Sequence, residues 1–129
     1  MVDGRSKGQR NPAATRRKLV DAAATLFHRK RFQGCGVQEI YELAEVTRGA
    51  LFHHFKDKSQ LGVAVIEGPI REWIEETWLE PLREGEDVIA TIEVALGKIR
   101  DRSSQDEDFR QFGCPFATMV AEMAALDEA

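Results

Sequence analysis

Apolar residues recur at helical spacing along almost the whole chain, and no segment alternates apolar and polar residues as a strand does. Leu19, Ala23 and Phe27 follow one another at intervals of four residues, and Val88 and Ile92 do the same further along. Intervals of three and four residues place side chains on one face of a helix, whereas a half-buried strand requires an interval of two. We therefore expect an all-α fold.

Helix-breaking residues divide the chain into helices of different length. Asn11-Pro12 favours a helix start, because Asn is a good N-cap and Pro is tolerated in the first turn. This first helix is expected to end near residues 30–32. Pro69 interrupts the later helical pattern that starts at residue 57 or 58, which predicts a kink or a split. Further along we expect a helix end near Pro81, a loop at 84–87, a helix over 88–99, a polar loop at 101–108, a helical turn at 109–112 and a last helix from Pro115.

Two short apolar segments lie between the glycines at 34–36 and residue 57. The first covers residues 37–44 and the second covers residues 47–55, with a break of about three residues between them. Two short helices joined by such a turn form a helix-turn-helix, a motif that places its second helix in the major groove of DNA. The sequence therefore predicts that the second segment is a recognition helix.

The second short helix has a face suited to a DNA groove. Leu51 is expected to face inward, while Arg48, Gly49 and His53 fall on another side. An arginine can donate two hydrogen bonds to guanine, and small residues allow the backbone to approach the bases. Thr47 and the N–H groups of the helix start are expected to contact phosphate. The alternative is an ordinary surface helix, or a helix-turn-helix that contacts only proteins.

Charge is distributed unevenly along the chain. The net charge of -4 combines +6 over residues 1–58 with -10 over residues 59–129. A basic half joined to an acidic half suits a protein whose basic part meets a polyanion. This asymmetry favours nucleic-acid binding over protein contacts alone.

Several classes of protein are disfavoured by what the sequence lacks. It contains no nucleophile elbow, phosphate loop or HExxH motif, so we expect no enzyme activity and no cofactor. Cys35 and Cys114 lie far apart and do not match a zinc-finger spacing, so we expect reduced thiols and no metal. His53 and His54 are adjacent, so their rings are expected to point apart. Without a signal peptide or an apolar run long enough to span a membrane, a cytoplasmic protein is expected.

The region that contains these features resembles the N-terminal domain of TetR-family repressors. The likeness covers residues 15–66, and its core is the segment from Arg48 to Phe55 followed by Lys58. Residues 113–124 resemble a weaker motif found in the regulatory domain of some members. The resemblance implies a three-helix DNA-binding domain, followed by a helical body that binds a ligand and forms dimers. The set of residues predicted to bind DNA is Arg16, Gln38, Thr47, Arg48, Gly49, Ala50, Phe52, His53 and Lys58.

Three residues depart from the pattern that the resemblance implies. Phe52 replaces a Tyr, which removes a phenol that would bond to phosphate. Gly36 replaces a Ser or Thr that would cap the first short helix. Glu45 replaces a Gly in the turn, where a positive φ would cost a residue with a side chain about 1 kcal/mol. These departures are expected to weaken binding without abolishing it.

The acidic half is rich in aromatic and thioether side chains. Such side chains at helical spacing are often plain core, but the resemblance favours a pocket for a flat or apolar inducer that releases the repressor from its operator. A second hypothesis makes Cys114 a sensor of electrophiles or oxidants, because it lies at an expected helix start. The residues predicted to line the ligand site are Trp73, Trp78, Phe109, Phe112, Cys114, Phe116 and Met119.

These inferences give a division into a disordered basic arm at 1–11, a DNA-binding domain at 12–57 and a partial regulatory domain at 58–129. TetR-like proteins generally end with two further long helices that form the dimer, so this chain is expected to be truncated. The complete protein is expected to bind a palindromic operator as a homodimer. Residues 1–129 alone are expected to form only a weak dimer.

Overall fold

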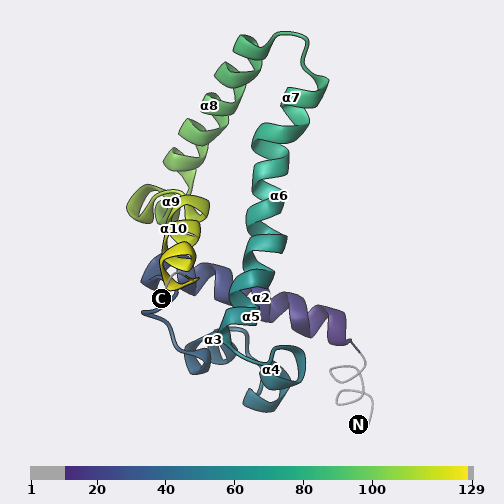
Figure 1. The fold of residues 1–129 in the computed structure, drawn as a ribbon, viewed down its shortest axis with the longest axis vertical. Coiled ribbons are helices and arrows are strands. Elements are labelled where there is room, and N and C mark those ends of the chain that lie inside the picture. Colours follow the sequence, from purple (N-terminus) through teal and green to yellow (C-terminus); the bar gives the residue numbers. More distant parts are fainter. Residues whose placement is uncertain (1–10, 128–129) are drawn as a thin grey trace. The chain divides into compact units, whose positions relative to one another are not determined.

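The computed structural model describes residues 11–127, and every regular element in that range is helical (Figure 1). The expected all-α fold is therefore confirmed for this part of the chain. Most of the predicted basic arm, residues 1–10, lies outside the described residues. The chain forms two compact units, one ending at Val65 and one starting at Ile66. Helix α5, Lys58–Val65, packs with the first unit.

Helix α2, Pro12–Lys30, begins at the predicted position. The side chain of Asn11 accepts a hydrogen bond from the backbone N–H of Ala14 at 3.0 Å, which satisfies one of the free donors of the first turn. Pro12 takes the first helical position, where its missing N–H costs nothing. The hydroxyl of Thr15 donates to the backbone carbonyl of Asn11 at 3.2 Å.

The first unit is closed by helices α3, Val37–Leu43, and α4, Arg48–His54, which pack against α2 together with α5. Each helix contributes apolar side chains to one shared core. Burial of these side chains removes them from water and supplies most of the driving force for folding of the unit. The core side chains are Leu19, Ala23, Phe27, Phe32, Cys35, Ile40, Leu51, Phe55 and Leu61.

The loop between α2 and α3 is tied down from two sides. Lys58 donates from Nζ to the backbone carbonyls of Phe32, at 2.9 Å, and Cys35, at 3.1 Å. The start of α3 is held by Glu39, which accepts the N–H of Gly36 at 3.1 Å and also pairs with Lys30. The hydrogen bond from Lys30 is the main cause that lowers the pKa of the Glu39 carboxyl. Glu39 therefore supplies part of the capping that Gly36 cannot.

The second unit begins with a run of helical segments in which two turns are π-helical. These are η1, Ile66–Ile70, α6, Arg71–Ile74, η2, Glu75–Leu79, and α7, Glu80–Glu84. Pro69 lies inside η1 and Pro81 follows η2. A proline lacks the N–H that an α-helix needs, and a π-turn absorbs the interruption by shifting the hydrogen-bond pattern. Of the kink or split predicted at Pro69, the split is therefore wrong, because the helical segments follow one another without a break. They also continue past Pro81 to Glu84.

One carbonyl left free by Pro81 is used by a neighbouring helix. Continuing the π pattern would require an N–H from Pro81 to the carbonyl of Glu76, and proline has none. Lys98 donates from Nζ to that carbonyl at 3.2 Å. The carbonyl of Glu76 therefore forms a hydrogen bond that links its helix to α8, the helix of Lys98, Val88–Gln105.

The rest of the second unit consists of α8, Val88–Gln105, α9, Glu107–Phe112, and α10, Pro115–Asp127. Asp87 caps α8 by accepting from the N–H of Ile89 and Ala90. The loop predicted at 101–108 is wrong, because α8 continues to Gln105 and only Asp106 interrupts the helices. An i, i+4 pair between Arg102 and Asp106, 3.6 Å apart, supports this last turn.

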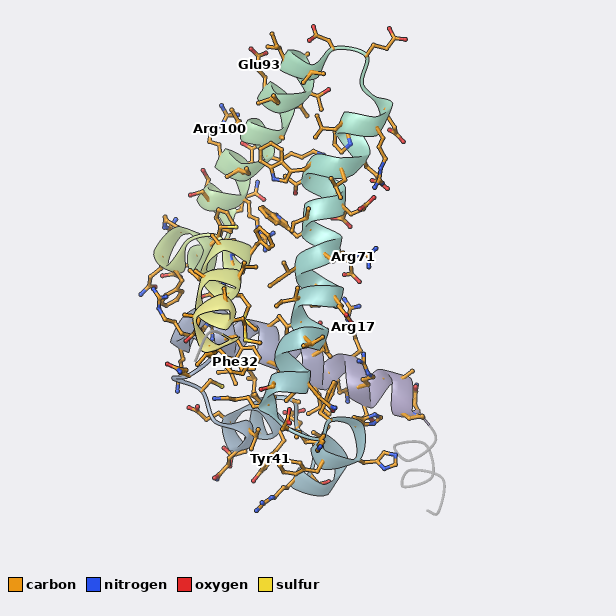
Figure 2. All side chains as sticks on the ribbon, viewed as in Figure 1. Arg17, Phe32, Tyr41, Arg71, Glu93 and Arg100 are labelled. Carbon is orange, nitrogen blue, oxygen red and sulfur yellow. The ribbon has the colours of Figure 1, made fainter. Side chains whose placement is uncertain are left out.

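Helix α8 buries only part of the apolar stripe that its sequence suggested. Thr91 and Ala95 are buried against the preceding helices, whereas Val88 is 58% exposed and Leu96 is 54% exposed. The polar residues Glu93 and Arg100 point outward from α8 (Figure 2). The apolar residues of α8 therefore lie partly on its buried side and partly on its exposed side.

Candidate nucleic-acid interface

The turn between α3 and α4 fixes how the second helix leaves the first. The N–H of Val46 donates to the carbonyl of Tyr41 at 3.0 Å, and the N–H of Glu45 donates to that of Glu42 at 3.1 Å. These two bonds form a Schellman motif, which ends a helix with one residue in the left-handed region. Glu45 is that residue, with φ 58°. The positive φ expected at Glu45 is therefore confirmed.

Replacing Glu45 with Gly should relieve this strain. We expect the free energy of unfolding of the first unit to rise by about 0.5–1 kcal/mol, because Gly adopts positive φ without a Cβ clash. Chemical denaturation of the full chain measures the change. Glu45→Ala is the matched control, since it removes the same carboxylate but keeps a Cβ. Equal stability of the two variants would contradict the strain argument.

Helix α4 is capped at its start and anchored from one side. The Oγ1 of Thr47 accepts from the N–H of Ala50 at 3.1 Å, in an extended N-cap conformation. Leu51 and the following Phe55 are buried in the core of the first unit. Because both anchors lie on one side of a seven-residue helix, the opposite side is held outward in a fixed orientation.

The outward side of α4 is exposed and carries no acidic residue. Arg48, Gly49, Phe52 and His53 are all exposed, as is the capping Thr47. The guanidinium of Arg48 lies over the ring of Phe52, 5.5 Å from its centroid. Among the residues that the structure describes, no carboxylate pairs with Arg48. Because its charge is not neutralised by a carboxylate, the Arg48 guanidinium is available to a ligand outside the protein.

Small residues occupy the part of this face nearest the helix start. A Cβ added at Gly49 would meet only the Oγ1 of Thr47, at 3.9 Å, which is an ordinary contact distance. Ala50 is half-buried beside it. The fold could therefore accommodate a larger side chain at position 49, although the sequence has glycine there.

A cluster of three cationic or titratable groups lies at the end of α4. The guanidinium of Arg16, from α2, lies 5.0 Å from the centroid of the Phe55 ring. The rings of His53 and His54 do not point apart as expected, because they meet edge to face with centroids 5.2 Å apart. Burial is the main cause that lowers the pKa of the His54 ring, and the charges of His53 and Arg16 add to it. These causes favour the neutral form of the His54 ring, while Arg16 and His53 face solvent.

The remaining two residues of the predicted set have partners within the protein. Gln38 is exposed on α3, and its amide donates to the carboxylate of Glu42 at 2.9 Å. Lys58 uses two of its three ammonium donors on the loop carbonyls described above, and its charge lies 4.6 Å from the centroid of the Phe32 ring. This internal role of Lys58 could not be predicted from the sequence, since its partners lie more than twenty residues away.

The predicted ligand residues lie in the second unit, and the structure brings two of them together. The rings of Trp73 and Phe109 are 6.2 Å apart. Arg102 lies over both, 5.5 Å from the first centroid and 5.2 Å from the second. Met119 is buried and Phe116 is 38% exposed, while the others are half-buried: Trp78, Phe112 and Cys114. The contact of Arg102 with these two rings was not predicted from the sequence. The sequence does contain one relevant signal, the i, i+4 spacing of Arg102 and Asp106, which holds the arginine on this side of α8.

The two cysteines lie in different surroundings. Cys35 is almost fully buried in the loop before α3, and burial raises the pKa of its thiol to about 11. Such a thiol is a poor nucleophile. Cys114 is half-buried before α10, and its carbonyl accepts the N–H of Thr118 at 3.2 Å. Both thiols are free, as predicted.

The fold and the turn define a helix-turn-helix protein, and comparison with known proteins agrees. Residues 19–65 match the family model described as bacterial regulatory proteins, tetR family. The match ends at the same residue as the first compact unit. The first compact unit is therefore similar to bacterial regulatory proteins of the tetR family.

Two of three individual relatives are named as a transcriptional regulator or repressor. An uncharacterized HTH-type transcriptional regulator of Lactococcus lactis is 25% identical over 88% of this chain and 57% of its own length. The HTH-type transcriptional repressor NemR of Escherichia coli is 28% identical over 88% of this chain and 56% of its own length. The TetC protein of transposon Tn10 from Escherichia coli is 40% identical over 46% of this chain and 30% of its own length.

These matches cover only part of each relative. The chain spans between 30% and 57% of the length of the three relatives named above. No solved structure gives a significant match. Among the described residues, no helix is both long and apolar enough to span a bilayer.

Proposed function

We propose that this chain is a sequence-specific, double-stranded-DNA-binding transcriptional regulator that inserts α4 into the major groove. The observation that carries the proposal is the outward face of α4, which is exposed, free of acidic residues and rigidly backed by Leu51 and Phe55. A major groove admits one helix, and recognition requires donors placed at fixed positions along it. Arg48 and His53 supply those donors, and Gly49 and Ala50 keep the surface between them low.

Contacts to phosphate would set the position of α4 on the duplex. Arg16 is exposed beside the end of α4, and Thr47 is exposed at its start. Groups at both ends of a recognition helix can bond to the two backbones that border the groove. Lys58 retains one free donor for the same purpose, and Gln38 lies exposed on the preceding helix.

The finer features of the proposal concern the complete protein. Two copies would bind a palindromic operator, with their recognition helices about one turn of DNA apart. A small molecule bound by the second unit would release the repressor by favouring a conformation with another spacing. Support for a ligand response is the aromatic pair Trp73 and Phe109, and support for repression is the repressor named among the relatives.

Binding should weaken steeply with salt if α4 meets DNA. With three or four phosphates contacted per chain, we expect the logarithm of the binding constant to fall with the logarithm of salt concentration at a slope of about -3. Removing the exposed cation in Arg16→Gln should make that slope shallower by about one. Fluorescence anisotropy of a labelled duplex, titrated with the full chain between 50 and 200 mM salt, is the measurement.

Arg71→Gln is the matched control for this titration. Arg71 is an exposed arginine of α6 that points away from the other helices of the second unit (Figure 2), and its loss removes the same charge. The slope of this variant should equal that of the unchanged chain. A salt-independent affinity, or no binding to any duplex at low salt, would favour a helix-turn-helix that contacts only proteins.

A further inference from the structure

The recognition helix holds an arginine against an exposed aromatic ring. Arg48 and Phe52 are four residues apart, which places them on one side of α4 in successive turns. The guanidinium carbon of Arg48 is 5.5 Å from the ring centroid of Phe52, within the range of a cation–π contact. The ring itself is 40% exposed, so the core does not require it.

The position of Arg48 is unfavourable for the helix that carries it. Arg48 is the first residue of α4, where a positive charge opposes the helix dipole. The first turn contains no acidic residue to offset it, and among the described residues no carboxylate pairs with it. The fold therefore gains little from this cation, and the ring of Phe52 is the contact that determines where it lies.

We propose that Phe52 is a positioning residue, which holds the guanidinium of Arg48 ready to donate two hydrogen bonds to the O6 and N7 atoms of one guanine. This inference rests on the proposed function, and it names the base that the site recognises. A free arginine side chain must give up many rotamers to form a bidentate contact, whereas one already resting on a ring gives up fewer.

The test uses a duplex that the full chain selects from a random pool. Each guanine of the selected duplex is replaced in turn by 7-deazaguanine, which lacks the N7 acceptor. With the unchanged chain, one such replacement in each half-site should lower the affinity about five-fold or more, because it removes half of a bidentate contact. This ratio of affinities is here called the N7 penalty, and its loss in Arg48→Lys assigns it to Arg48 rather than to His53.

Two substitutions at position 52 then separate positioning from other roles. Phe52→Tyr keeps the ring, so the N7 penalty should stay within about two-fold of that of the unchanged chain. Phe52→Leu keeps an apolar side chain but loses the ring, so the penalty should fall below about two-fold. Arg48→Lys keeps the charge but loses the planar fork, and it should remove the penalty as well. Thermal unfolding confirms that each variant is folded.

The outcomes distinguish this inference from the function on which it rests. An unchanged N7 penalty in Phe52→Leu, even with weaker binding overall, would mean that the ring contacts DNA itself and would overturn the inference alone. A selected duplex in which no guanine shows the penalty would also overturn it and leave DNA binding intact. Failure of the unchanged chain to bind any duplex at low salt would reject both.

Discussion

Gly49→Leu should abolish DNA binding, with a loss of at least about one hundred-fold, and leave the protein folded. The second position of α4 is exposed, and the nearest atom to an added Cβ is 3.9 Å away. Nothing in the fold therefore requires glycine there. A helix, by contrast, prefers alanine to glycine by about 1 kcal/mol, so the glycine costs stability.

The proposed insertion of α4 into the major groove accounts for this glycine, because it requires a close approach of the backbone to the groove floor. A leucine side chain would hold α4 away from the base edges, and every short hydrogen bond to a base would be lost together. Gly49→Ala should be intermediate, with binding weakened by about ten-fold and stability equal or slightly raised. Affinity for the selected duplex and the midpoint of thermal unfolding are measured on the same samples.

Gly97→Ala provides the matched control for position 49. Gly97 lies within α8 in the second unit, and a Cβ added there meets nothing within 4 Å. The substitution should raise stability through the same helix preference, without any change in DNA affinity. Gly49→Ala binding as tightly as the unchanged chain would show that the backbone of α4 does not touch the bases.

The local features of the fold could be predicted because local interactions determine them. Asn11 with Pro12 predicted the start of α2, and the break at 45–47 predicted the turn between α3 and α4. In each case the residues involved are within five positions of one another. Asp101 to Gln105 was wrongly predicted as loop, because polar side chains are also compatible with an exposed helix.

The features that could not be predicted depend on residues far apart in sequence. Lys58 binds carbonyls of the loop before α3, and Lys98 binds a carbonyl freed by Pro81. Arg102 lies over the rings of both Trp73 and Phe109, where the sequence suggested only aromatic walls. For the candidate site, the exposed face of α4 was predicted by its pattern. The contact between Arg48 and Phe52 was missed, although their spacing of four residues indicates it.

Gly34→Ala should destabilise the first unit by about 2–4 kcal/mol, because a backbone atom occupies the space that its Cβ needs. An added Cβ would lie 2.1 Å from the carbonyl oxygen of Lys30, at the end of α2. Neither atom can turn aside as a flexible side chain does, so the loop itself must move. Phe32 and Cys35 are buried in that loop, and Lys58 bonds to both of their carbonyls.

The displacement would reach the DNA-binding face through α3, since this loop sets where α3 begins. Gly36→Ser is the matched control two residues away, because a Cβ there meets nothing within 4 Å and the extended N-cap conformation suits serine. Its stability should be unchanged or raised by a few tenths of a kcal/mol. Chemical denaturation compares the variants, and equal unfolding midpoints for both would mean that the loop before α3 yields without cost. If Gly34→Ala is as stable as the unchanged chain but binds DNA more weakly, the substitution has changed the orientation of α3 and α4. The affinity of that variant for DNA, titrated with salt, then measures the change.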